Sequence, residues 1–426
     1  MLDEIASCFH SLLNQETESI GVLHMTANEN LMSKAASHLV ASPLCSRYYS
    51  DTYDGVNQSA KQQYYSIGNA IYRGLPAVYD FEYRARECSN KLFDAAYSDF
   101  SPLSGMHAVI CIVSSLTKPG DVVLTFSPKS AGHHATSHLL NALGRRSVQI
   151  PWDNENMTVD LSALSDVVQI NKPSMLLMDL GRPLFPLPLQ EMRRLIGPKT
   201  FMVYDASHVL GLIAGKQFQR PLIEGCDVLI GNTHKTFPGP QKGILLFADA
   251  KLGQKTCLSL FETVVSSQHT HHAMALYITL FEMAAHAKIY ATQIINNART
   301  FASELMRHGF KVLSRRGEPP HSHVVAISGG FPKGHLDACK RLHQCNISTN
   351  TQNIFGADCV RTGVQELTRR GMKEKEMAYI AELFKKIILE EDLHAIHSVC
   401  EFNSNYQKVC FTLDDVLLPL LTMRGR

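Results

Sequence analysis

Short apolar runs alternate with amphipathic stretches over residues 104–300 of the chain. Several of these runs are aliphatic or β-branched at nearly every position, which predicts strands that are buried on both faces. They are DVVLTF (121–126), SMLLMDL (174–180), FMVYDA (201–206), DVLIGN (227–232) and GILLFAD (243–249). Buried strands separated by helical segments are typical of an α/β fold with a mostly parallel sheet. We therefore expect ligands to bind at the carboxyl ends of the strands.

The pattern changes after this region. Residues 273–308 predict a long helix, or two in sequence, that ends before Gly309. Shorter strand candidates at 310–314, 323–328 and 358–363 and an amphipathic helix at 374–391 predict a smaller α+β domain. We expect three regions, namely an N-terminal segment (1–75) that packs on the rest, a large domain (76–300) and a C-terminal small domain (301–426).

Composition narrows the class of protein. The 426 residues carry 41 basic and 39 acidic side chains spread along the chain, which argues against nucleic acid as a partner. The first twenty residues lack the pattern of a signal peptide, and no apolar run is long enough to span a membrane. Eleven scattered cysteines without a CxxC pair favour reduced, mostly buried thiols, and we expect no metal site. A cytoplasmic protein is the expectation.

One lysine lies in an unusual context. Lys235 follows an apolar run in GNTHKTFPGPQKG (231–243), and Asp205 ends the run FMVYD. A partly desolvated amine at the mouth of an α/β pocket is a nucleophile for carbonyl groups. Pyridoxal phosphate is held by such a lysine, with an acidic residue facing its pyridine nitrogen. Taken singly, a surface lysine and an unrelated strand-end aspartate explain these residues better.

Further candidates fit the same cofactor. The turn Ser104-Gly105 runs into an apolar stretch, as at a helix start that binds an anion. His133 in SAGHHAT is a candidate for stacking on an aromatic ring, although a loop histidine without such a role is equally consistent. Arg361 lies within an apolar strand, where a buried guanidinium needs a carboxylate from a substrate or from the protein. Glu29 is a candidate proton shuttle.

Together, motifs in a constant order resemble those of the serine hydroxymethyltransferase-like enzymes, which are fold type I pyridoxal phosphate proteins with an aspartate aminotransferase-like large domain. The resemblance covers roughly residues 20–390. It rests on TANENLMS, RYYSDTYDG, SGM, AGHH, YDASHVLGLIAG, THKTFPGPQKG and VRTGVQELTRRGMKEKEM.

The resemblance implies a role for each matching residue. Lys235 would be the Schiff-base lysine, Asp205 the partner of the pyridine nitrogen, His133 the stacking residue, and His208 a contact near the cofactor 3′-oxygen. Cofactor binding would involve Ser104, Gly105 and Thr233, while Arg361 would bind the substrate carboxylate and Glu29 would move protons. Three tyrosines match residues that line the family's site, in some cases from a neighbouring subunit: Tyr49, Tyr53 and Tyr72. A homodimer, with the N-terminal segment also packing on the partner, is implied.

Departures from the family pattern favour one branch. The family's QGGPxxH segment is replaced by VVSSQHTHHA (264–273), with Ser266 and Ser267 at the glycines, and Gly181 lies near an expected serine. The loop near the folate ring is short. NTHKTFPGPQKG, STN and GVQELTRRGMKEKE resemble the L-threonine transaldolases, which do not use folate. These enzymes cleave threonine to a glycine-derived quinonoid and acetaldehyde, and then add the quinonoid to another aldehyde to give a β-hydroxy-α-amino acid.

We therefore expect a pyridoxal phosphate-dependent threonine transaldolase that acts on an amino acid (threonine, serine or glycine) and an aldehyde. The alternatives are a folate-dependent serine/glycine hydroxymethyltransferase, or another type I enzyme acting on an amino acid, such as a threonine aldolase. A non-catalytic relative that keeps the fold is a further possibility, which the replaced glycines and serine motivate.

Overall fold

A computed structural model of the chain describes residues 1–47, 64–67, 70–130 and 132–422, which form two compact units. Unit 1 comprises Met1–Glu29 and Gln293–Cys410, and unit 2 comprises Asn30–Thr292 and Phe411–Arg426. The division falls inside one helix, α10 (Thr270–Arg307), which matches the long helix predicted from residue 273 to residue 308. The domain boundaries predicted at residues 75 and 300 stay a prediction.

Unit 2 is built on a sheet that has seven strands in the described residues, in the order β4-β12-β11-β10-β9-β5-β6. The strands from β6 to β11 in this order run parallel, which confirms the mostly parallel α/β fold. β12 is antiparallel to both of its neighbours, because the short connection after β11 returns the chain directly instead of crossing over the sheet. The strands are β4 (Tyr97–Asp99), β5 (Val122–Thr125), β6 (Arg146–Gln149), β9 (Met175–Met178), β10 (Phe201–Asp205), β11 (Val228–Asn232) and β12 (Gly243–Phe247).

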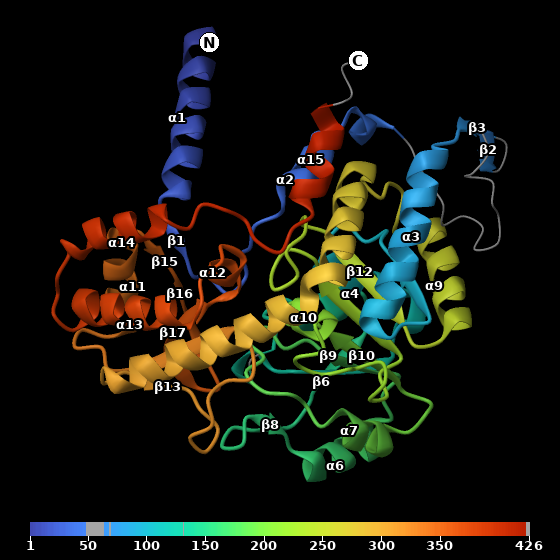
Figure 1. The fold of residues 1–426 in the computed structure, drawn as a ribbon. Helices are drawn as coiled ribbons and strands as arrows, with labels where there is room; N and C mark the ends of the chain where they lie inside the picture. The colour runs from blue at the N-terminus through green and yellow to red at the C-terminus, as the bar shows by residue number, and fades with distance from the viewer. Residues whose placement is uncertain (48–63, 68–69, 131, 423–426) are drawn as a thin grey trace. The chain divides into compact units, whose positions relative to one another are not determined.

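Helices pack on this sheet through a core of fully buried apolar side chains. Val123, Leu177 and Val203 on the strands meet Ile112 of α4 and Leu260 of α9 in one cluster. Figure 1 shows α4 beside β12 and α3 close by. The helices are α2 (Lys34–Val40), η1 (Pro43–Ser46), α3 (Pro76–Phe93), α4 (Gly105–Leu116), η3 (Pro128–Ser130), α5 (Thr136–Ala142), α6 (Leu161–Asn171), α7 (Leu189–Ile196), α8 (Leu210–Ala214), α9 (Ala250–Thr263) and α15 (Asp414–Thr422). Two hairpins complete the unit: β2 (Tyr64–Ile67) with β3 (Ala70–Arg73), and β7 (Trp152–Asp153) with β8 (Thr158–Val159).

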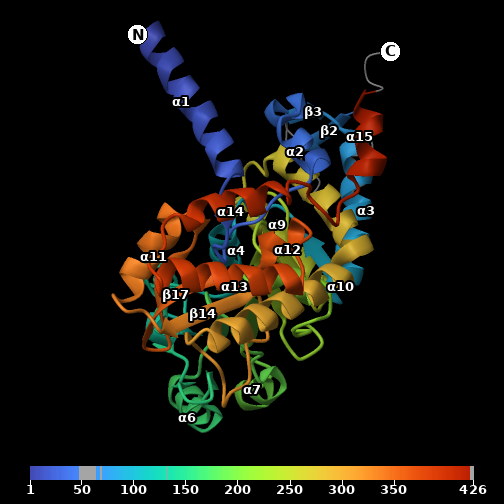
Figure 2. The same ribbon diagram turned by 60° about the vertical axis from the view of Figure 1, so that its left-hand side comes forward.

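Unit 1 has the predicted α+β character. Its main sheet has four strands in the described residues, in the order β13-β14-β17-β16, all antiparallel. In Figure 2, α11 and α13 lie beside strands β14 and β17, and α14 runs alongside α13. The elements are β13 (Lys311–Val312), β14 (Val324–Gly329), α11 (His335–Gln344), β16 (Asn350–Ile354), β17 (Ala357–Gly363), α12 (Gln365–Arg369), α13 (Glu374–Ile388) and α14 (Ala395–Ser404).

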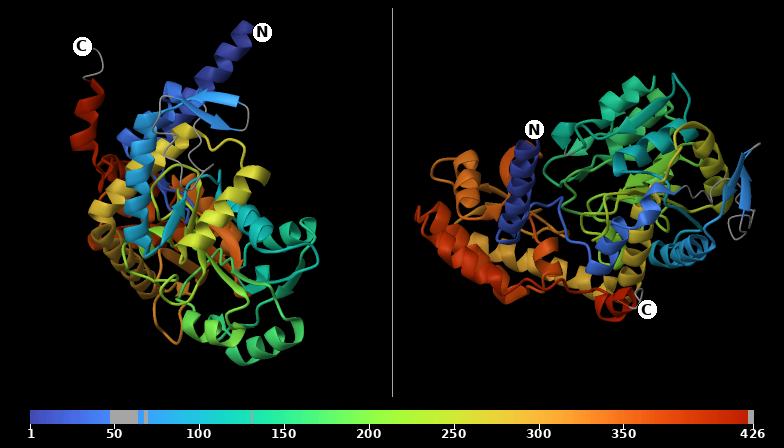
Figure 3. Two further views of the ribbon diagram at one scale, coloured as in Figure 1. Left: turned by 90° about the vertical axis from the view of Figure 1, so that its right-hand side faces the viewer. Right: turned by 90° about the horizontal axis from the view of Figure 1, so that it is seen from above.

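The N-terminal residues join unit 1 through a small parallel pair. β1 (Leu23–His24) pairs with β15 (Ile347–Ser348). Before it, α1 (Leu2–Ile20) has no buried residue along its nineteen positions. Figure 1 shows α1 projecting from unit 1, with only its C-terminal end near β1, and the same helix projects in Figure 2 and in both views of Figure 3. Among the described helices, none has the length and apolar character to cross a bilayer.

Candidate active site

A cavity of about 150 Å³ in unit 2 brings together five of the predicted site residues, namely Gly105, His133, Asp205, His208 and Lys235. Each follows or ends a strand of the sheet, or begins the helix after it. The carboxyl ends of parallel strands therefore build this cavity, as expected from the sequence.

The amine of Lys235 faces an imidazole. Its Nζ lies 3.1 Å from Nε2 of His208, a buried residue that follows β10. The backbone carbonyl of Lys235 accepts a hydrogen bond from the side chain of Asn30. Both ends of the residue are thus held, and the amine is presented to the cavity from a fixed position.

The loop after β11 is closed by internal hydrogen bonds. Thr233 is fully buried, and its hydroxyl donates to the carbonyl of Pro240 at 2.6 Å. Gly239 donates its N–H to the carbonyl of Thr233 at 2.7 Å, and a Cβ on Gly239 would lie 2.8 Å from that oxygen. The structure places Thr233 at the base of the loop and outside the cavity lining. Its hydroxyl orients the loop that carries Lys235.

Asp205 and His133 lie on the cavity wall. Asp205 is the last residue of β10, and its carboxylate accepts a hydrogen bond from Ser207 N–H at 2.8 Å. The ring of His133 lies 4.6 Å from that of His134, centroid to centroid. Burial lowers the pKa of His133, and the neighbouring His134 lowers it further while Asp205 opposes the shift. A neutral imidazole is therefore favoured, which suits stacking on a flat ring.

The turn Ser104-Gly105, which the sequence predicts to bind a phosphate, has the geometry of a capped helix start. Ser104 is the N-cap of α4, and its hydroxyl oxygen accepts a hydrogen bond from His107 N–H at 3.1 Å. Gly105 N–H donates to Asn232 Oδ1 at 2.7 Å, and a Cβ on Gly105 would lie 2.6 Å from the Asn232 side chain. Only glycine fits this approach. The positive end of the α4 dipole faces the cavity beside these residues, which favours an anion there.

Asp179 is a cavity residue that the sequence reasoning missed. It follows β9, is almost fully buried, and accepts hydrogen bonds from Thr125 Oγ1 at 2.7 Å and Phe126 N–H at 3.2 Å. Its other oxygen lies 3.3 Å from His133 N. Burial raises the pKa of Asp179 to about 6, against the opposing hydrogen bonds from Thr136, Thr125 and Phe126. The signal was present in the sequence, because an aspartate ends an apolar run here just as Asp205 does.

Arg361 lies in unit 1, on β17. It is 3% exposed, and Nη1 donates to Gln352 Oε1 at 2.8 Å while Nη2 donates to Asn28 Oδ1 at 2.9 Å. These two partners are amides that orient the guanidinium. A planar guanidinium held in this way suits the two oxygens of a carboxylate.

Glu29, also in unit 1, is surrounded by groups that favour its ionised form. Thr26 Oγ1 donates to its carboxylate, and His24 Nδ1 lies 3.6 Å away. The interaction with His24 lowers the pKa of Glu29 most strongly, burial opposes it, and Thr26 and the charge of Arg361 lower it further. A carboxylate with this environment is ionised at neutral pH and ready to accept a proton.

The other residues that the sequence singled out are the three tyrosines, Gly181 and the two serines before α10. Tyr49 and Tyr53 lie outside the described residues, and Tyr72 lies in β3. Gly181, near the expected serine, lines the cavity. Ser266 and Ser267 are exposed between α9 and α10, next to Gln268, whose carbonyl accepts a hydrogen bond from the buried Lys242 Nζ at 2.7 Å.

The cavity residues fit pyridoxal phosphate. An amine, a carboxylate and a neutral imidazole surround one space, and a helix start with a glycine that admits no Cβ borders it. These are the groups that the cofactor's aldehyde, pyridine nitrogen, ring and phosphate require. Fold and cavity together are those of a fold type I pyridoxal phosphate-dependent enzyme.

The comparisons with known proteins place the chain within this class. The serine hydroxymethyltransferase profile matches residues 3–384. The serine hydroxymethyltransferase of Methanosphaera stadtmanae is 34% identical over 407 residues, 92% of this chain and 92% of that protein. The chain belongs to the serine hydroxymethyltransferase family. This membership confirms the predicted resemblance, the fold, the cofactor and the class of enzyme.

Two relatives carry transaldolase names. The fluorothreonine transaldolase of Streptantibioticus cattleyicolor is 39% identical over 388 residues, which are 91% of this chain and 60% of that protein. The chain thus spans less than two thirds of that relative's length. The crystal structure of L-threonine transaldolase from Pseudomonas fluorescens in its internal aldimine state matches with a TM-score of 0.90 and 26% identity, over 100% of this chain and 98% of that one.

Proposed function

We propose that the protein is a pyridoxal phosphate-dependent L-threonine transaldolase. The observation that carries this proposal is the agreement of two comparisons, since a sequence relative and a solved structure with transaldolase names both match more than nine tenths of the chain. In this reaction threonine loses acetaldehyde, and the remaining glycine unit is added to an acceptor aldehyde. The product is a new β-hydroxy-α-amino acid.

The cavity residues have distinct roles in the proposal. Lys235 supplies the amine that holds the cofactor covalently, and His208 orients this amine. Asp205 would keep the pyridine nitrogen protonated, and the imidazole of His133 would stack on the ring. Bound in this way, pyridoxal phosphate delocalises the negative charge that develops at Cα of an amino acid.

The substrate is bound and deprotonated by residues of unit 1 in this proposal. Arg361 binds the α-carboxylate through its guanidinium. Glu29 accepts the proton of the β-hydroxyl of threonine as the Cα–Cβ bond breaks and acetaldehyde forms. When the new Cα–Cβ bond forms, a proton returns to the oxygen of the acceptor aldehyde, so protons balance over the cycle. The resemblance supports these roles, and also contributions from Tyr49, Tyr53 and Tyr72.

A folate-dependent serine/glycine hydroxymethyltransferase is the main alternative, because the family profile and several relatives carry that name. The test compares one preparation with two substrate pairs, L-threonine with an aromatic aldehyde and L-serine with tetrahydrofolate. We expect the new amino acid from the first pair and no folate-dependent loss of serine from the second. Serine cleavage that requires folate would replace our proposal with the hydroxymethyltransferase. Acetaldehyde release without a new amino acid would indicate a simple aldolase.

We also propose a cytoplasmic homodimer. The resemblance supports a second subunit, and so does the exposed apolar side of α1, which includes Ile5, Phe9 and Leu12 at more than half exposure. Most of a helix's stability in a protein comes from packing of its apolar face, so a partner that covers this side would stabilise α1. Light scattering of the purified protein measures the subunit number, and a monomer at assay concentrations would refute the dimer.

A further inference from the structure

His24 joins the end of helix α1 to the carboxylate of Glu29. It pairs with Ser348 across β1 and β15. Its Nε2 lies 2.9 Å from the carbonyl oxygen of Ser19 and 3.2 Å from the Ser19 hydroxyl, and its Nδ1 lies 3.6 Å from Glu29 Oε2. An imidazolium donates from both nitrogens, so the protonated ring satisfies both neighbours at once.

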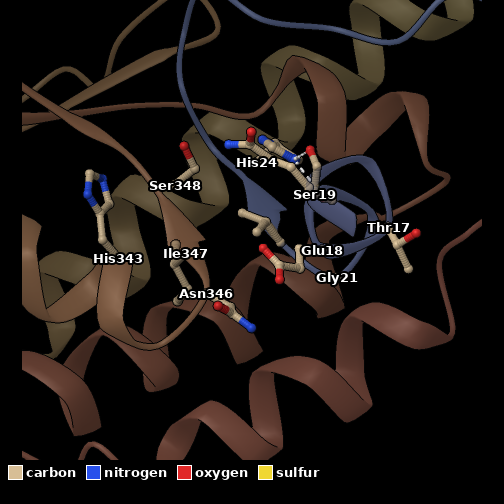
Figure 4. A pocket seen from close by; sticks show the side chains of 11 residues that line it. Thr17, Glu18, Ser19, Gly21, His24, His343, Asn346, Ile347 and Ser348 are labelled. Atoms are coloured by element: carbon tan, nitrogen blue, oxygen red, sulfur yellow. Dashed lines mark hydrogen bonds between the residues drawn. The ribbon is translucent and has the colours of Figure 1, made fainter. Parts of the chain in front are cut away.

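The far side of His24 borders a cavity of unit 1. This cavity has a volume of about 640 Å³, and Glu18, Asn346 and Ser348 also line it. Figure 4 shows the bond between His24 and Ser19 at its edge. The volume is large enough for many water molecules. The His24 side chain is 20% exposed, so one edge of the ring is within reach of this water.

The surrounding charges favour a proton on His24. The interaction with Glu29 raises the pKa of His24 most, burial opposes it, and the carboxylate of Glu366 on α12 raises it further. Glu366 is itself bound to Arg370, with Nη2 and Oε1 separated by 3.2 Å. On the other side, Arg361 of β17 helps to lower the pKa of Glu29. Each partner thus stabilises the charged form of the other.

We propose that His24 is a positioning residue that keeps Glu29 ionised and aimed, and that it exchanges protons between Glu29 and the water of the adjoining cavity. This inference rests on the proposed function, in which Glu29 accepts the β-hydroxyl proton. Histidine suits the role because its two nitrogens bind and release protons on opposite sides of one ring.

Protons and charge balance in each half of the proposed cycle. Before cleavage the pair is His24⁺ with Glu29⁻. Glu29 takes the β-hydroxyl proton, and His24 releases its Nε2 proton to water through the exposed hydroxyl of Ser19, which then donates to Nε2, so the net charge of the pair stays zero. In the addition half both transfers run in reverse, and Glu29 returns a proton to the new β-hydroxyl. No uncompensated charge therefore arises in this half-buried place.

The interaction between His24 and Glu29 is tested first by a titration that does not depend on catalysis. Histidine ring signals of the full chain are titrated by NMR in the wild type and in Glu29→Gln, with His24→Gln assigning the signal. We expect the His24 signal to titrate above the ordinary value of about 6.5 in the wild type and lower in Glu29→Gln. An unchanged titration would overturn the proposal. This outcome does not depend on the reaction that the enzyme catalyses.

The kinetic test uses two reactions of the holoenzyme. Threonine cleavage needs removal of the β-hydroxyl proton, whereas exchange of the glycine α-proton with D₂O does not. We expect His24→Ala to slow cleavage by about 10- to 100-fold and to change glycine exchange by less than about 3-fold, since a lost proton-transfer group costs such factors. The acid limb of kcat should also move to higher pH, because Glu29 loses the group that lowers its pKa most.

Imidazole and a matched variant complete the test. Added imidazole should enter the space left in His24→Ala and restore cleavage several-fold. His343→Gln is the control, because His343 lines the same cavity but contacts Thr349 instead of Glu29. Equal losses in both reactions, or equal effects of the two variants, would assign His24 a purely structural role. If the enzyme forms no new amino acid from an acceptor aldehyde, only the transaldolase proposal fails. The effects of the His24 variants on threonine cleavage, glycine exchange and the NMR titration would still be observed.

Discussion

Lys235 contacts His208 across two neighbouring strand ends, with Nζ 3.1 Å from Nε2. His208 follows β10 and Lys235 follows β11, and the hydroxyl of Thr236 donates to the carbonyl of His208 at 2.8 Å. A Cβ on Gly211 would lie 2.2 Å from the carbonyl oxygen of Thr236, so only glycine allows the two loops to approach so closely. The position of the amine is therefore set by the packing of both loops, and not by the lysine rotamer alone.

Replacement of Lys235 by alanine should abolish the covalent link to the cofactor. Activity is expected to fall by more than about 10³-fold, because Lys235 is the one lysine among the described residues that line the cavity. Borohydride reduction followed by mass spectrometry of the peptides detects the link. Lys251→Ala, which removes an exposed lysine of α9, is the control and should retain it. A reduced cofactor adduct that persists in Lys235→Ala would show that another residue carries the cofactor.

Asp179→Asn should change how stability depends on pH. The pKa of Asp179 is raised to about 6 in the folded protein, against an ordinary value of 3.8. The folded state therefore binds this proton more tightly, so the associated stability is present below the unfolded pKa and is lost as pH rises through about 6. As pH rises from 4 to 7, the free energy of unfolding of the asparagine variant should therefore increase by roughly 1–3 kcal/mol relative to that of the wild type.

Urea unfolding of both proteins at several pH values measures this difference. The amide also replaces an acceptor near His133 N–H by a donor, which adds a destabilisation that is independent of pH. A difference between variant and wild type that stays constant over this pH range would contradict the raised pKa.

Arg361→Lys should weaken substrate binding more than turnover. Lysine cannot make the planar, two-pronged contact with a carboxylate, and it loses the bonds to Gln352 and Asn28 that orient the guanidinium. We expect KM for the amino acid to rise by about 10- to 100-fold, with a smaller change in kcat. Arg341→Lys, at an arginine that pairs with Asp337 on the surface of the same unit, is the control. An unchanged KM would exclude Arg361 from carboxylate binding.

Much of the fold could be predicted because the central strands of the large sheet are apolar at nearly every position. The runs ending at Asp205 and Asn232 are such strands, and the residues that follow them line the cavity. The direction of β12 could not be predicted, since an antiparallel strand buried on both faces has the same apolar pattern as a parallel one.

Other site features depend on contacts between distant parts of the chain. Asn232 binds Gly105 N–H across 127 positions, and nothing in the local pattern of either residue indicates this bond. His24 acquires its place through the pairing of β1 with β15, more than three hundred residues later. Such residues are ordinary polar positions in the sequence, and they acquire a chemical context only in the folded chain.

The most direct test of the account follows the carbon atoms of the substrate. L-threonine labelled with ¹³C at Cα is incubated with the holoenzyme and an aromatic aldehyde, and products are identified by NMR and mass spectrometry. We predict that the label appears in a new β-hydroxy-α-amino acid, with one acetaldehyde released for each molecule formed. Label found only in glycine, or acetaldehyde released at the same rate without an acceptor, would contradict the assignment as a transaldolase.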